Sequence, residues 1–139
     1  MNKINSLFIV LILSTFIYCQ NTKKENENIN KIDKVQIKSV DFSIMTFLSV
    51  ECDKFEEYFK EYRIISITDT AVINELLNQI DKFEPIDSTY SKEIDTRAKI
   101  ELFFKNHTNT ICVGNLTLHM NNNIYKTPQE LIDFIDKIE

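Results

Sequence analysis

Six side chains able to carry acid–base or electrostatic chemistry gather in the polar stretch over residues 84–96 and just after it. They are Asp87, Ser88, Tyr90, Glu93, Asp95 and Arg97. Two carboxylates that converge can serve as the acid and the base of a hydrolase. The same side chains on a solvated loop would make only local hydrogen bonds to the backbone. We favour the solvated loop, so no catalytic residue is assigned, and a hydrolase using the 84–96 loop is the last-ranked function.

The two histidines follow no metal-binding or catalytic pattern. His107 lies in a predicted turn and His119 in a predicted strand. Zinc sites usually contain closely spaced Cys or His pairs, and the sequence has none. The single glycine also leaves no Gly-rich loop for a phosphate. We therefore expect neither a metal nor a cofactor.

The first residues predict an export signal. A short segment with one charge, Lys3, precedes an apolar run over residues 7–18. As a helix this run would span about 18 Å, which is too short for a bilayer core of about 30 Å. The pattern is typical of a secretory signal, so residues 1–19 are expected to direct the protein out of the cytoplasm.

Cys19, the last residue of this signal, has two interpretations. In the first, its thiol is acylated as in bacterial lipoproteins and anchors the protein to a membrane. Lipoprotein signals place a small residue before the cysteine, whereas this chain has Tyr18. In the second, the signal is cut after Cys19 and the mature chain begins at Gln20. Both interpretations predict an extracytoplasmic location: membrane-anchored, periplasmic or secreted.

Two further cysteines, Cys52 and Cys112, remain in the exported chain. In an oxidising compartment they can form one disulfide, which would close a loop of about 60 residues. Alternatively both are small hydrophobic core residues, because each has apolar neighbours. The sequence leaves both possibilities open.

The charge balance limits the choice of partners. The net charge is −5, and an acidic surface repels phosphate backbones and anionic lipid headgroups. Nucleic acid is therefore not an expected partner, and a membrane is expected only through a lipid on Cys19. Another protein is the expected partner, and a basic one would be steered toward the acidic surface.

The chain divides into the signal, a linker and one domain. Residues 20–34 are polar and without periodicity, which predicts a flexible linker. Residues 35–139 carry the alternating and helical patterns of a globular domain.

The domain is expected to begin with a strand and a short helix. The strand extends over residues 35–50, with a phase change near Ser39 that indicates a bulge. The helix extends over residues 53–61, and a capping box of Asp53 and Glu56 starts it.

A second strand and the clearest amphipathic helix follow. The strand covers residues 63–68. The helix starts at Asp69 or Thr70 and ends before Pro85, because its apolar residues recur at helical spacing up to that point.

Antiparallel strands and a last helix complete the domain. A strand over residues 97–105 leads through a turn into a segment around Gly114, which we interpret as a bulge in one long strand rather than a hairpin turn. The run Asn121-Asn122-Asn123 predicts a turn before a short strand. Thr127 and Glu130 then predict a capping box at the start of the last helix.

Together these elements predict an α+β fold in a single domain. The sheet is expected to be mainly antiparallel, with about five strands, two longer helices and one short helix.

The N-terminal segment, the VECDKF segment and the closing TICVG and NNNIYKTPQELIDFI segments resemble those of small uncharacterised exported or lipoprotein-like bacterial proteins. The resemblance implies no activity. We therefore expect an exported cell-envelope or secreted protein that acts as a non-enzymatic binding or structural module. The main alternative is an acidic inhibitor or immunity-type protein that binds a basic partner.

Overall fold

The computed structural model of the chain describes residues 31–86 and 94–138. The predicted signal, Cys19 and residues 20–30 of the predicted linker lie outside the described residues. Among the described helices, none is long and apolar enough to cross a membrane.

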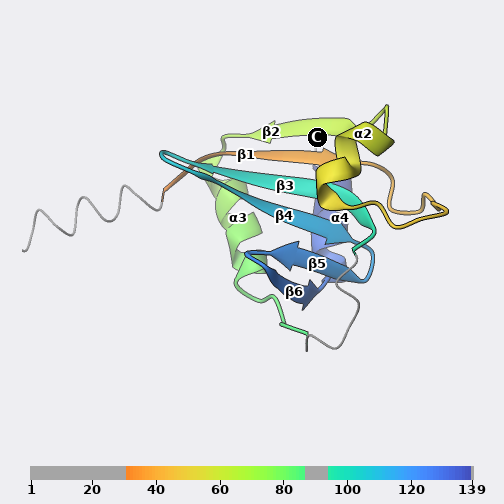
Figure 1. Cartoon of the computed structure of the whole chain (residues 1–139). Helices are drawn as coiled ribbons and strands as arrows, with labels where there is room; N and C mark the ends of the chain where they lie inside the picture. The colour runs from red at the N-terminus through yellow and green to blue at the C-terminus, as the bar shows by residue number, and fades with distance from the viewer. Residues whose placement is uncertain (1–30, 87–93, 139) are drawn as a thin grey trace, which may run out of the picture. The chain divides into compact units, whose positions relative to one another are not determined.

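One antiparallel sheet and three helices form an α+β domain, which confirms the predicted fold class (Figure 1). The sheet has six strands in the order β2-β1-β3-β4-β5-β6, one more than the sequence indicated. The strands are β1 Ile32–Ser39, β2 Arg63–Ile67, β3 Thr96–Phe104, β4 Thr108–Gly114, β5 Thr117–Met120 and β6 Asn123–Lys126. The helices are α2 Phe55–Tyr58, α3 Thr70–Ile80 and α4 Gln129–Lys137, and a 3-10 turn, η1 Cys52–Lys54, precedes α2.

The main core lies between one face of the sheet and the two longer helices. Figure 1 shows α3 and α4 behind the sheet. Alternate strand residues point toward them, so Val35 and Ile37 of β1 are buried with Ile100 of β3 and Ile111 of β4. The helices contribute the buried residues Ile73, Leu76, Leu131, Ile132 and Ile135. Burial of these side chains supplies most of the driving force for folding.

A second, smaller cluster lies outside this core, in the segment that connects β1 to β2. It consists of Val40, Val50, Phe55 and Phe59, with Tyr62 packed against it. We call residues 40–62 the outer arm, because η1 and α2 lie in front of the sheet, opposite α3 and α4 (Figure 1). The domain therefore has apolar packing on both sides of the sheet.

The first strand differs from the prediction at both ends. It starts at Ile32, three residues inside the predicted linker, because Ile32 is buried and pairs with Phe104. It ends at Ser39, and the predicted strand over 40–50 is a loop. The bulge lies between Ile32 and Lys34, not near Ser39.

The predicted helix over 53–61 is shorter, and its capping box is absent. No side chain caps η1 or α2. The Glu56 carboxylate binds Lys38 and Lys99 instead, so it is not available to the helix start. The chain leaves the helix at Phe59, whose ring packs 5.2 Å from that of Phe55.

The interpretation of Gly114 as a bulge in one long strand is wrong, because the chain forms a hairpin there. β4 ends at Gly114, and β5 returns antiparallel to it, with Val113 opposite Leu118. A Cβ atom on Gly114 would lie 2.8 Å from the carbonyl oxygen of Asp95. Glycine is therefore required by the close approach of the neighbouring backbone.

The starts of the two longer helices contrast. Asp69, one of the two residues at which the helix was expected to start, caps α3, and its carboxylate accepts hydrogen bonds from the backbone N–H of Ala71 and Val72. The predicted capping box at Thr127 does not form, since α4 begins after Pro128 without a side-chain cap. In the turn between β5 and β6, Asn121 and Asn122 adopt positive φ angles, as the predicted turn requires.

Replacing Gly114 by alanine tests this hairpin. The new methyl group would collide with the Asp95 carbonyl oxygen and lie 3.1 Å from that of Thr117, so we expect a loss of about 1–3 kcal/mol in the free energy of unfolding. Urea denaturation measures it. Leu116→Ala, at an exposed position of the same turn, should change stability by less than about 0.5 kcal/mol. Equal stability of the two variants would contradict the close approach.

Candidate functional site

A buried arginine fixes the loop over residues 40–50. Thr96 pairs with Gly114 and Ala98 pairs with the adjacent Val113, so Arg97 is the extra residue of a bulge in β3. Thr96, Arg97 and Ala98 are consecutive, yet all three are buried. The bulge thus brings a charged side chain, only 2% exposed, under the loop.

Asp95 neutralises this arginine in a bidentate ion pair. The Arg97 Nη1 and Nη2 atoms lie 2.7 and 2.6 Å from the Asp95 Oδ1 and Oδ2 atoms. The guanidinium also donates to the carbonyl oxygen of Ile44 at 3.1 Å and to the Thr46 hydroxyl at 3.0 Å. Such a paired and hydrogen-bonded charge is tolerated inside a protein, because its desolvation is compensated.

The same two residues hold both ends of the loop. The Val40 N–H donates to the carbonyl oxygen of Arg97 at 3.0 Å. The Val50 N–H donates to the Asp95 carboxylate at 3.0 Å, and the Val50 carbonyl oxygen accepts from the Thr96 N–H at 2.9 Å. The loop is therefore bonded to β3 at its start, centre and end.

Between these anchors the loop exposes apolar side chains. Met45, Phe47 and Leu48 are 95%, 104% and 76% exposed, and Ile44 is exposed as well. We call Ile44, Met45, Phe47 and Leu48 the apolar tip. Adjacent exposed apolar residues of this size are a common feature of interaction sites.

The outer arm is also attached to the sheet by a disulfide between Cys52 and Cys112, which the sequence allowed as one of two possibilities. Cys112 lies on β4 and faces the outer side of the sheet, opposite His119 of β5. The sulfur–sulfur bond links positions 60 residues apart. A disulfide is consistent with an oxidising, extracytoplasmic compartment.

Glu56 makes a second attachment to the same sheet face. Its carboxylate lies 3.0 Å from the Lys38 Nζ atom and 2.9 Å from the Lys99 Nζ atom. Burial alone would raise the pKa of Glu56, but hydrogen bonds from Lys99 and Lys38 outweigh it and bring the pKa to about 2. Lys38 also binds Glu101 at 3.2 Å, so four charges compensate one another.

The surroundings of the apolar tip are acidic. The exposed carboxylates of the outer arm are Asp41, Glu51, Asp53, Glu57 and Glu61, whereas its exposed cations are Lys54 and Lys60. Lys54 is already paired with Glu57. A hollow beside the tip is lined by Ile44, Tyr62 and three carboxylates, those of Asp41, Glu61 and Asp136. Arg63 lines it too, but its guanidinium donates to the last carbonyl oxygens of α4, including that of Asp136.

The structure brings together only two of the side chains considered for catalysis. Asp95 and Arg97 form the ion pair that holds the loop, so neither is free to act as an acid or a base. Asp87, Ser88, Tyr90 and Glu93 lie outside the described residues. The structure therefore gives the hydrolase hypothesis no further support.

The histidines lie in different surroundings. The His107 ring stacks on that of Phe104, with centroids 4.4 Å apart. His119 is partly buried, its Nε2 atom has no hydrogen-bond partner, and burial lowers its pKa. The described ranges contain no group of three or more His, Cys, Asp or Glu side chains that could hold a metal.

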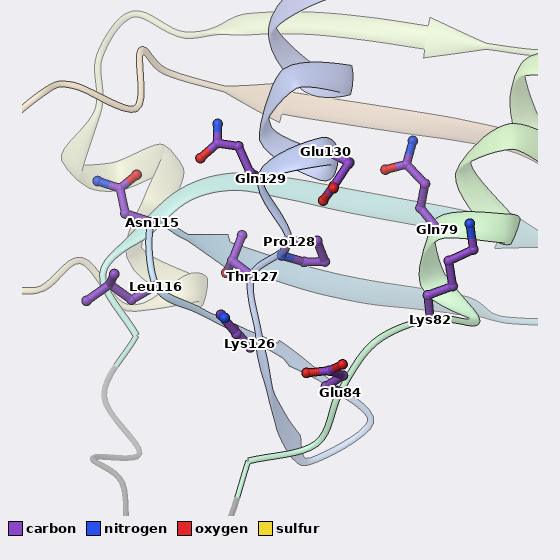
Figure 2. A pocket seen from close by; sticks show the side chains of 10 residues that line it. All are labelled: Gln79, Lys82, Glu84, Asn115, Leu116, Lys126, Thr127, Pro128, Gln129 and Glu130. Atoms are coloured by element: carbon purple, nitrogen blue, oxygen red, sulfur yellow. The ribbon is translucent and has the colours of Figure 1, made fainter.

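A separate pocket of about 600 Å³ lies where α3 ends and α4 begins. Figure 2 shows Gln79 on α3 and Lys82 just after the end of this helix, with Gln129 and Glu130 at the start of α4. Glu84 and Lys126 lie below Thr127 and Pro128 in this view, and the β4–β5 turn adds Asn115 and Leu116.

Two polar atoms in the wall of this pocket have no hydrogen-bond partner within residues 31–86 and 94–138. They are the Thr127 hydroxyl oxygen and the Gln79 Oε1 atom. Thr127 is only 7% exposed. Since an unpaired buried polar group costs about 1–3 kcal/mol, this wall is destabilised relative to a hydrogen-bonded one.

Neither the apolar tip nor the pocket was predicted from the sequence. The sequence predicts a strand over residues 35–50, which includes the tip, because Phe42 and Ile44 alternate as strand residues do. Arg97 is the residue from which the ion pair could have been predicted. A charged residue at the edge of a strongly apolar strand needs a partner, and Asp95 lies two residues away.

Comparisons of the chain with family models, with curated proteins and with solved structures find no match. The functional interpretation therefore depends on the geometry of these residues.

Replacing Asp95 by asparagine tests the anchor of the loop. The change would leave the buried guanidinium without a counter-charge, and we expect a loss of about 2–4 kcal/mol in the free energy of unfolding. Because the Asp95 side chain is 43% exposed, we expect a loss in the lower part of this range. Urea denaturation measures the loss, and Asp53→Asn is the matched control, because it removes an exposed carboxylate of the outer arm. A control variant as unstable as Asp95→Asn would contradict the anchor.

The low pKa of Glu56 predicts a loss of stability in acid. A folded-state pKa near 2 lies below the ordinary value of 4.5, so the stabilisation is complete above about pH 4.5 and declines as the pH falls toward 2. The Glu56 side chain is 30% exposed, so solvent screening reduces the expected loss to about 1–2 kcal/mol. Urea denaturation between about pH 6 and about pH 2.5 measures it. The decline should be smaller in Glu56→Gln, and an identical pH profile for both proteins would rule out this role.

Proposed function

We propose that this protein is an exported binding module that inserts its apolar tip into a cleft of a basic protein partner. The observation that carries the proposal is the exposure of Met45, Phe47 and Leu48 on a loop that is bonded to β3 at three points. A fixed loop loses little conformational freedom on binding, so more of its apolar contact contributes to affinity.

The chemistry of the partner is inferred from the charges around the tip. Carboxylates predominate on the outer arm, and they would face lysine or arginine side chains on the rim of the cleft. The hollow lined by Asp41, Glu61 and Asp136 beside Ile44 suits a cationic side chain of that rim. A membrane surface with anionic headgroups is disfavoured by the same carboxylates.

The setting is an oxidising compartment, as the disulfide suggests. In that compartment, a lipid on Cys19 would anchor the protein to a membrane, or cleavage after Cys19 would release it. Intact mass spectrometry of the exported protein distinguishes the anchored form from the released form. Where the partner is an enzyme, insertion of the tip would block its cleft. This is the inhibitor or immunity-type role that the sequence offers as an alternative.

Photo-crosslinking from the apolar tip tests the proposal. With p-benzoylphenylalanine in place of Phe47, we expect a discrete adduct with a basic protein from the producing cells. Its yield should fall as salt is added, because salt screens the acidic arm. The same group in place of Ile64, an exposed apolar residue on β2, serves as the matched control.

Three results would contradict a protein-binding tip: no adduct from position 47, an adduct with lipid alone, or the same adduct from position 64. Loss of the adduct in a folded Met45→Ser/Leu48→Ser variant would support it. These exposed substitutions should leave the free energy of unfolding within about 0.5 kcal/mol of the parent value, so misfolding would not explain the loss.

A further inference from the structure

The pocket between α3 and α4 combines several features of a small-molecule site. Its volume of about 600 Å³ is within the range of about 300–1,000 Å³ that is usual for such sites. It lies at the N-terminus of α4, which no side chain caps. The first-turn N–H groups of Gln129 and Glu130 and the helix dipole favour an anionic group there.

The unpaired polar atoms of the wall are an independent indication of a ligand. Thr127 is more than nine-tenths buried, and neither its hydroxyl nor the Gln79 Oε1 atom has a hydrogen-bond partner in the part of the chain that the structure describes. Both residues belong to the lining shown in Figure 2. Polar side chains that are this well buried normally have a partner, and an oxygen or nitrogen of a ligand would supply it.

The charges of the lining indicate what kind of ligand fits. Lys82 and Lys126 contribute two ammonium groups, and Glu84 and Glu130 contribute two carboxylates. None of these four forms an ion pair with another residue in the described part of the chain. A simple anion would face both glutamates, and a simple cation would face both lysines.

We propose that this pocket binds a zwitterion of the amino-acid or short-peptide class. The ligand carboxylate accepts hydrogen bonds from the first turn of α4, from the Thr127 hydroxyl and from the lysines. The ligand ammonium group is balanced by Glu84 and Glu130. Leu116 and Pro128 provide apolar contacts for the rest of the ligand.

Saturation-transfer difference NMR with a pool of Ala-Xaa dipeptides tests the proposal on the exported protein. We expect signals from a subset of the pool, and calorimetric titration of the strongest binder then gives its dissociation constant. N-acetylation of that dipeptide and amidation of its carboxylate should each weaken binding by about tenfold or more, because each removes one charge.

Variants of the wall connect binding to this pocket. Thr127→Val keeps the shape of the side chain and removes the hydroxyl, so it should weaken binding by about tenfold. Thermal unfolding of this variant checks that it remains folded. Thr110→Val, on the outer sheet face opposite Glu101, is the matched control and should bind normally. Lys126→Gln, with Lys60→Gln as its control, provides a second test that does not depend on Thr127.

Three outcomes would overturn the proposal. The first is an absence of saturation transfer from the whole pool at millimolar concentration. The second is equal binding of the free and the end-blocked dipeptides. The third is normal binding by both Thr127→Val and Lys126→Gln. The proposal is independent of the apolar tip, so the Met45→Ser/Leu48→Ser variant should bind dipeptides normally.

Discussion

The disulfide between Cys52 and Cys112 is the constraint on which the arrangement of the outer arm depends. The apolar cluster of the arm has only four buried residues, Val40, Val50, Phe55 and Phe59, and the other attachments of the arm to the sheet are the polar contacts of Arg97, Asp95 and Glu56. The disulfide bonds the arm to a central strand of the sheet and limits the conformations that it can reach when unfolded. Oxidising conditions that keep this covalent bond intact are therefore part of what makes this structure stable.

The ion pair of Arg97 and Asp95 has a different role from the disulfide. Buried ion pairs contribute little net stability compared with apolar packing, but they penalise conformations in which either charge loses its partner. Here the guanidinium also binds the Ile44 carbonyl oxygen and the Thr46 hydroxyl. The pair thus favours the one loop conformation in which the side chains of the apolar tip are exposed. Exposure of Phe47 and its neighbours is maintained by polar bonds beneath them.

The sequence predicts those parts of the fold that depend on local patterns. The helix α3 follows from its apolar spacing and from Pro85 after its end, and the Asn121–Asn122 turn follows from residues that tolerate positive φ. Local patterns give wrong predictions where a residue contacts a partner that is far away in the sequence. Glu56 matches a capping box but binds two lysines across the sheet, and Gly114 marks a close contact with Asp95. The pocket was missed for the same reason, because it is assembled from segments that are far apart in the sequence. The apolar tip is one short segment, but its conformation depends on Arg97, which lies far from it in the sequence.

Hydrogen–deuterium exchange of the oxidised and the reduced protein tests most directly whether the disulfide positions the outer arm. After reduction, amide exchange should rise by about tenfold or more across residues 40–62, because the arm opens locally. The strands β1, β3 and β4 should remain protected by the core between the sheet and the two longer helices. Unchanged exchange in residues 40–62 after complete reduction would contradict the account, since the arm would then be held without its covalent link.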